Sequence, residues 1–168
     1  MYRTAKLSDD LMMRWELECI WSPSPIQRIC VFLMLNPSTA TDVEPDPSFT
    51  RVCDFAKRWG YDGIRIVNLV SFRSPYPKIM YAWFAQQTKA VLAIHSAAAI
   101  MACDRKDVAK VVVAHGKLQG DAMKLYALQT LRVIQERHNL HCIKLNKDGS
   151  PGHPLYLSSK LVPRLYFV

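Results

Sequence analysis

Residues 29–35 read ICVFLML, and this unbroken apolar run decides the fold. A strand with one wet face alternates apolar and polar residues, whereas a strand buried on both faces of a parallel sheet is apolar throughout. We therefore predict a central strand at residues 29–35. Asn36, Pro37 and Ser38 follow it directly and have the composition of a turn.

Outward from this strand, strand and helix patterns alternate along the chain. Further strands are expected where apolar residues are dense between turn signals, at residues 15–20, 64–70, 108–114 and 141–145. Helices are expected between them, at residues 48–60 with Ser48 as the cap, 79–101 and 120–138. This alternation predicts an α/β fold of three layers (α/β/α) with a mostly parallel central sheet of about four strands.

Length and charge limit the domain organisation and the partners. With 168 residues, half of them apolar, the chain suits one compact domain, which we expect to span residues 1–168. The chain carries 22 Lys and Arg residues against 14 Asp and Glu, a formal net charge of +8. This excess favours a polyanionic partner such as nucleic acid, although basic residues spread along the chain suit an ordinary solvated surface equally well.

Several protein classes are not indicated. No apolar run approaches the roughly 18 residues of a membrane span, and residues 1–10 lack the apolar stretch of an export signal, so we expect a cytoplasmic protein. The five cysteines are widely separated and no Cys and His residues have zinc-ligand spacing, so we expect reduced thiols and no metal or cofactor. Glycine-rich phosphate loops and the nucleophile-elbow motif are absent as well.

Polar residues stand where each strand of the predicted parallel sheet ends. Asn36 follows the first strand, Asn68 lies near the end of the second, His115 follows the third, and a loop at 146–154 that contains His153 follows the fourth. Ligands of open α/β sheets bind beyond the carboxyl ends of the strands. We therefore predict that these side chains meet in one site.

Each of these residues also has a structural interpretation. Asn36 can be a turn cap that bonds its own backbone. Asn68 can be a structural hydrogen-bond bridge as readily as a reader of a ligand, because an amide inside an apolar strand must find partners. His115 can be a core histidine with its hydrogen bonds satisfied, and His153 a surface residue.

Three stretches carry a resemblance to a known family. These are VFLMLNPS at residues 31–38, a helix that ends in Trp59-Gly60-Tyr61, and IVNLV at residues 66–70. Together they resemble the bacterial and phage domain family of unknown function 1643, over nearly the whole chain. More remotely, the order of the motifs is similar to the uracil-DNA glycosylase superfamily, in which an Asn-Pro motif ends strand one, an Asn follows strand two and a His-Pro loop closes the site.

The resemblance implies a uracil-DNA-glycosylase-like fold and a role for each matching residue. Asn36 would position the attacking water, with Asp42, or Glu44 or Asp46 of the same acidic loop, as the alternative activator of that water. Asn68 would read the edge of an extruded base. Phe49 would stack on the base, Pro37 and Ser38 would lie beside it, and His153 would face the sugar or the departing base. The chemistry of the reaction offers His115 or His153 as the donor to the departing base.

Departures from the superfamily pattern put uracil specificity in doubt. Met34 and Ser38 stand where glycine is usual, and Leu155 stands where serine is usual. A bulkier, modified pyrimidine would suit such an altered pocket. The implied function is therefore a DNA glycosylase that excises a modified pyrimidine and leaves an abasic site, in defence against phage with modified DNA.

DNA is the expected partner, and neither a membrane nor an obligate protein partner is expected. Extrusion of a base requires a grip on the flanking phosphates. The residues expected to provide it are Arg51, Arg73, Lys117 and Lys147. Two other functions stay open: a non-catalytic module that binds nucleic acid or nucleotides, and a hydrolase or transferase that acts on free nucleosides.

Overall fold

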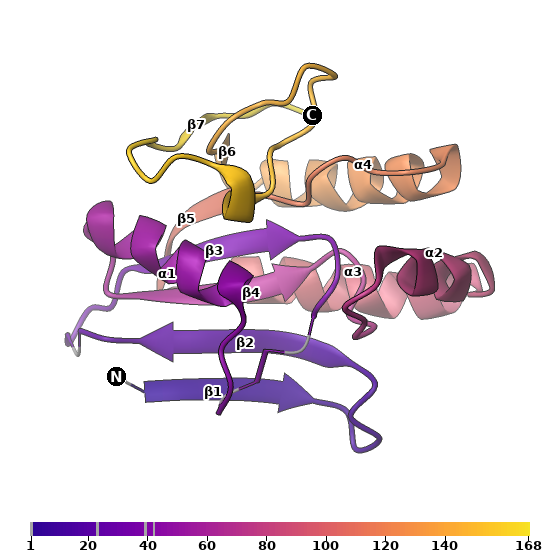
Figure 1. Ribbon diagram of the computed structural model, residues 1–168, viewed down its shortest axis with the longest axis horizontal. Coiled ribbons are helices and arrows are strands. Elements are labelled where there is room, and N and C mark those ends of the chain that lie inside the picture. The colour runs from indigo at the N-terminus through magenta and orange to yellow at the C-terminus, as the bar shows by residue number, and fades with distance from the viewer. Residues whose placement is uncertain (1, 23, 39, 42) are drawn as a thin grey trace.

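The computed structural model describes residues 2–22, 24–38, 40–41 and 43–168 (Figure 1). Within these residues one sheet of seven strands lies at the centre, in the order β1-β2-β4-β3-β5-β6-β7. The strands are β1 (Tyr2–Leu7), β2 (Arg14–Ile20), β3 (Ile29–Met34), β4 (Gly63–Asn68), β5 (Val108–Val113), β6 (Leu140–Cys142) and β7 (Arg164–Leu165). The α/β class predicted from the sequence is confirmed.

The predicted sheet of about four mostly parallel strands is wrong in size and composition. The strands β4, β3, β5 and β6 run parallel, but β1 and β2 add antiparallel pairs at one edge and β7 adds another at the opposite edge. Of these outer strands, β2 matches the strand predicted at residues 15–20, whereas β1 and β7 give no apolar run in the sequence. β1 contains only exposed and half-buried residues, and β7 is a two-residue exposed strand, as is common at sheet edges.

The strand at residues 29–34 is central, as predicted. All six residues of β3 are buried, and β3 pairs in parallel with β4 on one side and with β5 on the other. Its side chains point alternately to the two faces of the sheet, so that Phe32 and Leu33 belong to different parts of the core. An unbroken apolar run follows because neither face meets water.

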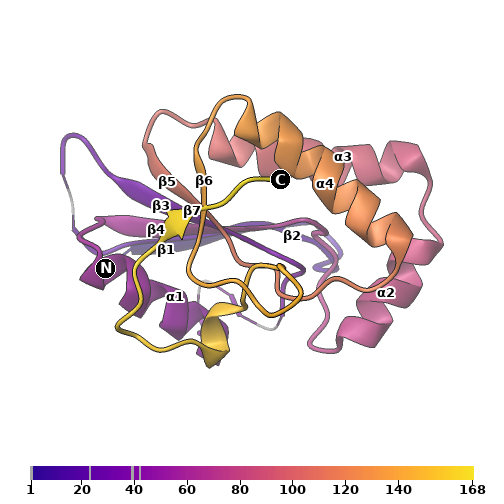
Figure 2. The same ribbon diagram turned by 90° about the horizontal axis from the view of Figure 1, so that it is seen from above.

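Helices cover both faces of the sheet (Figure 2). One face carries α1 (Pro47–Arg58) and the short 3-10 helix η1 (Pro154–Tyr156), and the other carries α2 (Pro77–Ala85), α3 (Lys89–Cys103) and α4 (Asp121–Gln135). Among the described residues, none of the helices has both the length and the apolar character that crossing a bilayer requires.

The N-cap of the first helix lies two residues before the predicted cap. Asp46, not Ser48, is the N-cap: its side chain accepts a hydrogen bond from the backbone N–H of Phe49 at 2.7 Å. Pro47 then occupies the first helical position, where its missing N–H costs nothing. Gly60 has a positive φ of 78° just past the end of α1, as predicted for a closing glycine.

The crossovers leave the centre of the sheet in opposite directions. From β3 the chain passes through α1 to β4, and from the neighbouring β5 it passes through α4 to β6 on the other side. Adjacent parallel strands whose connections diverge in this way leave a crevice at their carboxyl ends. This switch point between β3 and β5 positions the candidate site.

Candidate functional site

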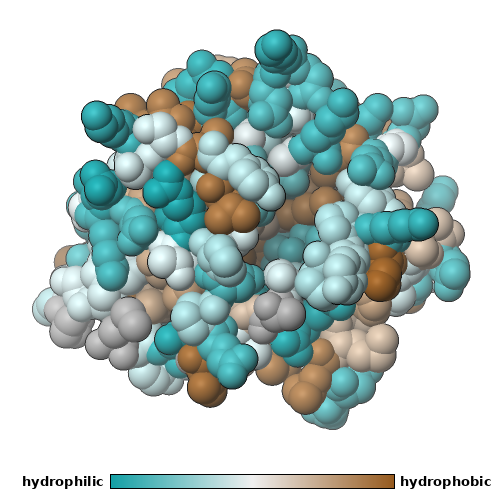
Figure 3. Space-filling model, in the orientation of Figure 1, coloured by the Kyte–Doolittle hydropathy of each residue, from teal (hydrophilic) through white to brown (hydrophobic). Residues whose placement is uncertain are grey.

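A cavity of about 450 Å³ opens at the carboxyl ends of β3, β4 and β5. Its lining comes from these strand ends and the loops after them, from the first turn of α1, from the loop before α2 and from the segment that leads into η1. In the orientation of Figure 1, Figure 3 shows a hollow near the middle of the surface. Most of the predicted site residues line this cavity together: Asn36, Ser38, Phe49, Asn68, His115, Lys117 and His153.

Asn68 is the most unusual polar residue of the cavity. It is the last residue of β4 and only 2 % exposed, and neither Nδ2 nor Oδ1 has a hydrogen-bond partner among the described residues. A buried amide left without partners costs about 1–3 kcal/mol for each unmade interaction. The structural interpretation of Asn68 as a hydrogen-bond bridge therefore has no support, and a ligand can supply the missing partners after a rotamer change of the kind common on binding.

Asn36 has a structural role that leaves one atom free. Its Nδ2 donates to the carbonyl oxygens of Pro37 at 3.1 Å and Ser74 at 2.9 Å. These two hydrogen bonds agree with the interpretation of Asn36 as a turn cap, and they fix the orientation of its side chain. No described residue donates to Oδ1, so this carbonyl oxygen is the part of Asn36 that can orient a water molecule.

The two histidines of the cavity offer complementary groups. Nδ1 of His115 lies 2.7 Å from the carbonyl oxygen of Gly116 and must carry the proton, which makes Nε2 an acceptor in the neutral ring. Nδ1 of His153 accepts from the N–H of Leu155 at 3.3 Å, so in the neutral ring Nε2 is a donor. Gly116 has no side chain, and a Cβ there would lie 3.6 Å from the Cβ of His153, so the two segments pack closely.

Burial keeps both histidines neutral. It lowers the pKa of His115, and the hydrogen bond to Gly116 only partly offsets this effect. Burial also lowers the pKa of His153, against the opposing effect of the negative charge of Asp46. Near pH 7 the cavity therefore presents one imidazole acceptor and one imidazole donor.

The acidic loop contributes Asp46 to the cavity. Oδ1 of Asp46 caps α1, and its carboxylate lines the cavity with Ser48 of the same turn. Asp42, the acidic residue first predicted to activate water, lies outside the described residues. Pro37 is buried and acts through its backbone, whose carbonyl oxygen accepts from both Asn36 and the N–H of Ser74.

Phe49 lines the cavity and is 5 % exposed. The guanidinium group of Arg3 lies 5.0 Å from the centroid of its ring. This cation–π contact covers one face of the ring. Stacking of a ligand on Phe49 is thus restricted to the other face or the ring edge.

The predicted basic residues are not equivalent. Lys117 lines the cavity, is largely exposed and lies 3.7 Å from Asp148, and Lys147 is exposed. Arg73 donates to the carbonyl oxygen of Leu11 at 2.9 Å beside a neighbouring groove. The structure does not leave Arg51 free for phosphates, because its guanidinium bonds the carbonyl oxygen of Leu157 and packs 4.9 Å from the ring centroid of Phe55.

Arg14 is the charged residue of the cavity lining that the sequence analysis did not single out. It is the first residue of β2, is only 3 % exposed and lines the cavity near Ala40. The signal available was a basic residue at the start of an otherwise buried strand. That signal is weak, because Arg3 and Arg28 also stand near strand ends.

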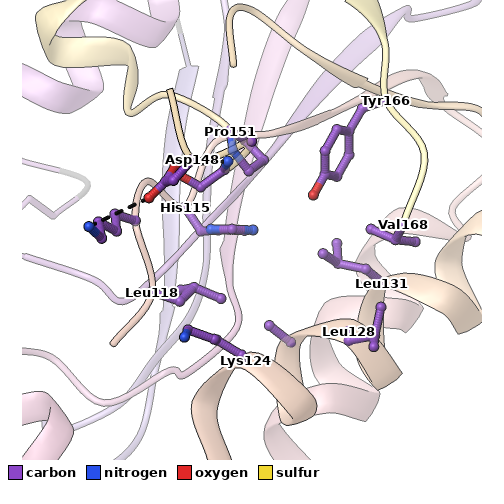
Figure 4. A pocket seen from close by; sticks show the side chains of 13 residues that line it. His115, Leu118, Lys124, Leu128, Leu131, Asp148, Pro151, Tyr166 and Val168 are labelled. Carbon is purple, nitrogen blue, oxygen red and sulfur yellow. Dashed lines mark hydrogen bonds and ion pairs between the residues drawn. The ribbon is translucent and has the colours of Figure 1, made fainter. Parts of the chain in front are cut away.

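A second cavity of about 550 Å³ adjoins the first and shares His115 and Lys117 with it (Figure 4). Its floor is apolar and comes largely from Leu128 and Leu131 of α4, and Figure 4 shows the hydroxyl of Tyr166 pointing into the space. Among the described residues, no cluster of three or more His, Cys, Asp and Glu side chains is arranged to hold a metal ion.

Comparison with known proteins identifies a family but no function. The model of a family described as "protein of unknown function (DUF1643)" matches residues 14–155, which include every described residue that lines the first cavity except Tyr156. No curated protein and no solved structure gives a significant match.

Proposed function

This chain belongs to the DUF1643 family of proteins of unknown function, and we propose that it is a DNA glycosylase. It would extrude a modified pyrimidine from DNA into the cavity between β3 and β5, hydrolyse the N-glycosidic bond and leave an abasic site. The remote similarity of its motif order to the uracil-DNA glycosylase superfamily is part of this proposal. So is its proposed setting in the cytoplasm, as a defence against phage with modified DNA.

The observation that carries the proposal is the unpartnered amide of Asn68. A carboxamide offers a donor and an acceptor side by side, and a pyrimidine edge offers the complementary pair. A base reaches such an enclosed reader only after it leaves the stack. The cavity volume of about 450 Å³ falls in the usual range of sites for small ligands.

The other cavity residues supply groups that the reaction needs. As the bond to C1′ breaks, its electron pair leaves with the base and the sugar becomes oxocarbenium-like. Oδ1 of Asn36 orients the water that adds its oxygen to C1′, and the carboxylate of Asp46 accepts a proton from it. Neutral His153 donates a hydrogen bond from Nε2 to the departing base anion and keeps its proton. The base anion finally takes up the proton that the water gave to Asp46, so that the net change is hydrolysis. Orientation and electrostatic stabilisation of this kind are the main sources of such rate enhancement.

The choice of a modified pyrimidine rests on the apolar lining. Met34 and Leu155 both line the cavity, at positions where the superfamily pattern has glycine and serine. Flexible apolar side chains can adapt to an extra substituent on the base.

Mass spectrometry of bases released from a panel of DNAs tests the proposal. The panel contains unmodified DNA and DNA with uracil, 5-hydroxymethylcytosine or glucosylated cytosine, each single- and double-stranded. We expect the wild type to release one modified pyrimidine, and Asn68→Leu to release it more slowly and with less preference over other bases. Binding without release from any DNA would favour the non-catalytic module, and release from free nucleosides alone would favour the nucleoside hydrolase.

A further inference from the structure

Arg14 is a buried cation that no carboxylate of the described residues contacts directly. Its Nη1 donates to the carbonyl oxygen of Ala40 at 2.7 Å, while Nε is enclosed without a hydrogen-bond partner among the described residues. No ion pair joins its guanidinium to a described carboxylate. The side chain is 3 % exposed and lines the same cavity as Asn68.

Arg65 shows how this fold treats an arginine that has only a structural role. Arg65 is fully buried in β4, and its guanidinium bonds Glu18 at 2.5 Å and Asp107 at 2.7 Å. Breaking a pair of this kind is costly, because a buried charge without a partner loses its hydration. The chain thus surrounds Arg65 with carboxylates, whereas Arg14, which is almost as deeply buried, has no carboxylate partner within the described part of the chain.

The groups around Arg14 leave a net positive charge at its end of the cavity. Burial lowers the pKa of Arg14 to about 10; the negative charge of Asp46 raises this pKa, and the positive charge of Arg73 lowers it further. Arg14 is therefore charged near pH 7. The charged groups that act on Arg14 are Asp46 and Arg73, and both histidines of the cavity are neutral. Lys117 also lines the cavity, but it lies 3.7 Å from the carboxylate of Asp148. Arg14 and Arg73 therefore face one carboxylate, Asp46.

We propose that Arg14 is the core of an oxyanion subsite inside the cavity, which takes a phosphate group of the nucleotide whose base Asn68 reads. Guanidinium groups match phosphate oxygens with two parallel donors, and the Nε edge of Arg14 carries no bond to a described residue. Because Nε is enclosed, phosphate binding requires a rotamer change of Arg14 of the kind common on binding. Ser48 in the first turn of α1 lines the same cavity and adds a hydroxyl. The inference rests on the proposed function only for the identity of the base.

With this subsite, the cavity recognises a nucleotide and not a nucleoside or a free base. The phosphate can belong to DNA or to a free nucleotide, because both present the same oxyanion. Lys117 at the rim would contact phosphates outside the cavity and leaves the inner subsite to Arg14.

Thermal melting in phosphate and in chloride of equal ionic strength tests the subsite. We expect phosphate to raise the melting temperature of the wild type with its concentration, since a ligand stabilises the state that binds it. In Arg14→Met the affinity for phosphate should fall at least tenfold, by about 1.4 kcal/mol. Arg14→Met should melt in chloride at or above the wild type, because it removes an uncompensated buried charge. The matched control is Arg58→Met, an exposed residue in the last turn of α1, which should respond to phosphate as the wild type does.

An unchanged melting temperature of the wild type in phosphate, or an equal response of Arg14→Met, overturns the inference. If Arg14→Met does not fold, the Nε–H resonance of Arg14 in the wild type decides instead: a shift on addition of phosphate supports the subsite, and a resonance that does not move overturns it. Titrations with a deoxynucleoside monophosphate and with a short oligonucleotide then identify the source of the phosphate. If phosphate binds but no base is released, only the proposed glycosylase activity is contradicted. If Arg14→Met releases bases as the wild type does, only the proposed phosphate subsite is contradicted.

Discussion

Asn36 donates from Nδ2 to the backbone carbonyl oxygen of Ser74 at 2.9 Å, which joins the loop after β3 to the loop before α2. The same nitrogen bonds the carbonyl oxygen of Pro37, so one side chain shapes the wall of the cavity and offers Oδ1 to a ligand. A structural role of Asn36 is therefore compatible with the catalytic role proposed for it.

Replacement of Asn36 by alanine should reduce both stability and activity. The loss of two hydrogen bonds lowers the free energy of unfolding by about 1–3 kcal/mol, measured by urea denaturation. Loss of Oδ1 should also slow base release by orders of magnitude while DNA affinity changes little. Asn36→Ala with wild-type stability would contradict the contacts described, and wild-type base release would contradict the catalytic role.

Asn68→Leu should have the opposite effect on stability. No described residue bonds the amide of Asn68, so an apolar side chain of similar size should raise the free energy of unfolding by about 1–3 kcal/mol. The same change should remove discrimination between bases, at a cost of about 1–3 kcal/mol in binding of the preferred base. Urea denaturation and competition binding measure the two effects. A destabilised Asn68→Leu would show that the amide has a structural partner.

The centre of the fold could be predicted because local pattern and burial agree there. A strand buried on both faces has to be apolar throughout, and parallel strands bring their carboxyl ends to one edge, so the sequence predicts that Asn36, Asn68 and His115 meet. The structure brings all three to one cavity.

Features that depend on distant pairing could not be predicted. Arg14 reaches the cavity only because β2 pairs with β4, a strand that lies far from β2 in the sequence. The cap of α1 was ambiguous locally, since Asp46 and Ser48 are both good capping residues and lie two positions apart. From its sequence neighbours alone, Arg51 could be exposed and contact a phosphate. Only the folded chain brings the carbonyl oxygen of Leu157 to its guanidinium group.

Stability should fall as the pH drops below the ordinary histidine value of about 6.5. Burial lowers the pKa of His115 in the folded chain, so the unfolded chain takes up the proton first as the pH falls. The contribution to stability is complete above pH 6.5 and is lost as the pH falls toward the lower pKa of the folded state. In His115→Asn, which can still donate to the carbonyl oxygen of Gly116, melting temperatures between pH 7 and pH 5 should decline less steeply than in the wild type. An equally steep decline of the melting temperature in His115→Asn and in the wild type would contradict the lowered pKa of His115.

Salt dependence of DNA binding separates basic residues that contact phosphates from those that pack within the protein. Removal of one phosphate-binding cation should reduce the slope of log K against log salt by about 0.9 for duplex DNA. We expect this reduction for Lys117→Gln and for Lys147→Gln. Arg51→Gln should leave the slope unchanged and lower the melting temperature, because its guanidinium bonds Leu157 and packs on Phe55. A reduced slope for Arg51→Gln would show that Arg51 reaches DNA.

Formation of abasic sites under single-turnover conditions tests the central claim most directly. Enzyme in excess is mixed with DNA that carries the base released in the panel experiment, and strand breaks at abasic sites are quantified after alkali treatment. We predict that the wild type converts all of the DNA, that His153→Ala converts it at least tenfold more slowly, and that Asn68→Leu converts it more slowly when the enzyme does not saturate the DNA. DNA that binds to the wild type and acquires no abasic sites, whatever modified base it carries, would contradict the account.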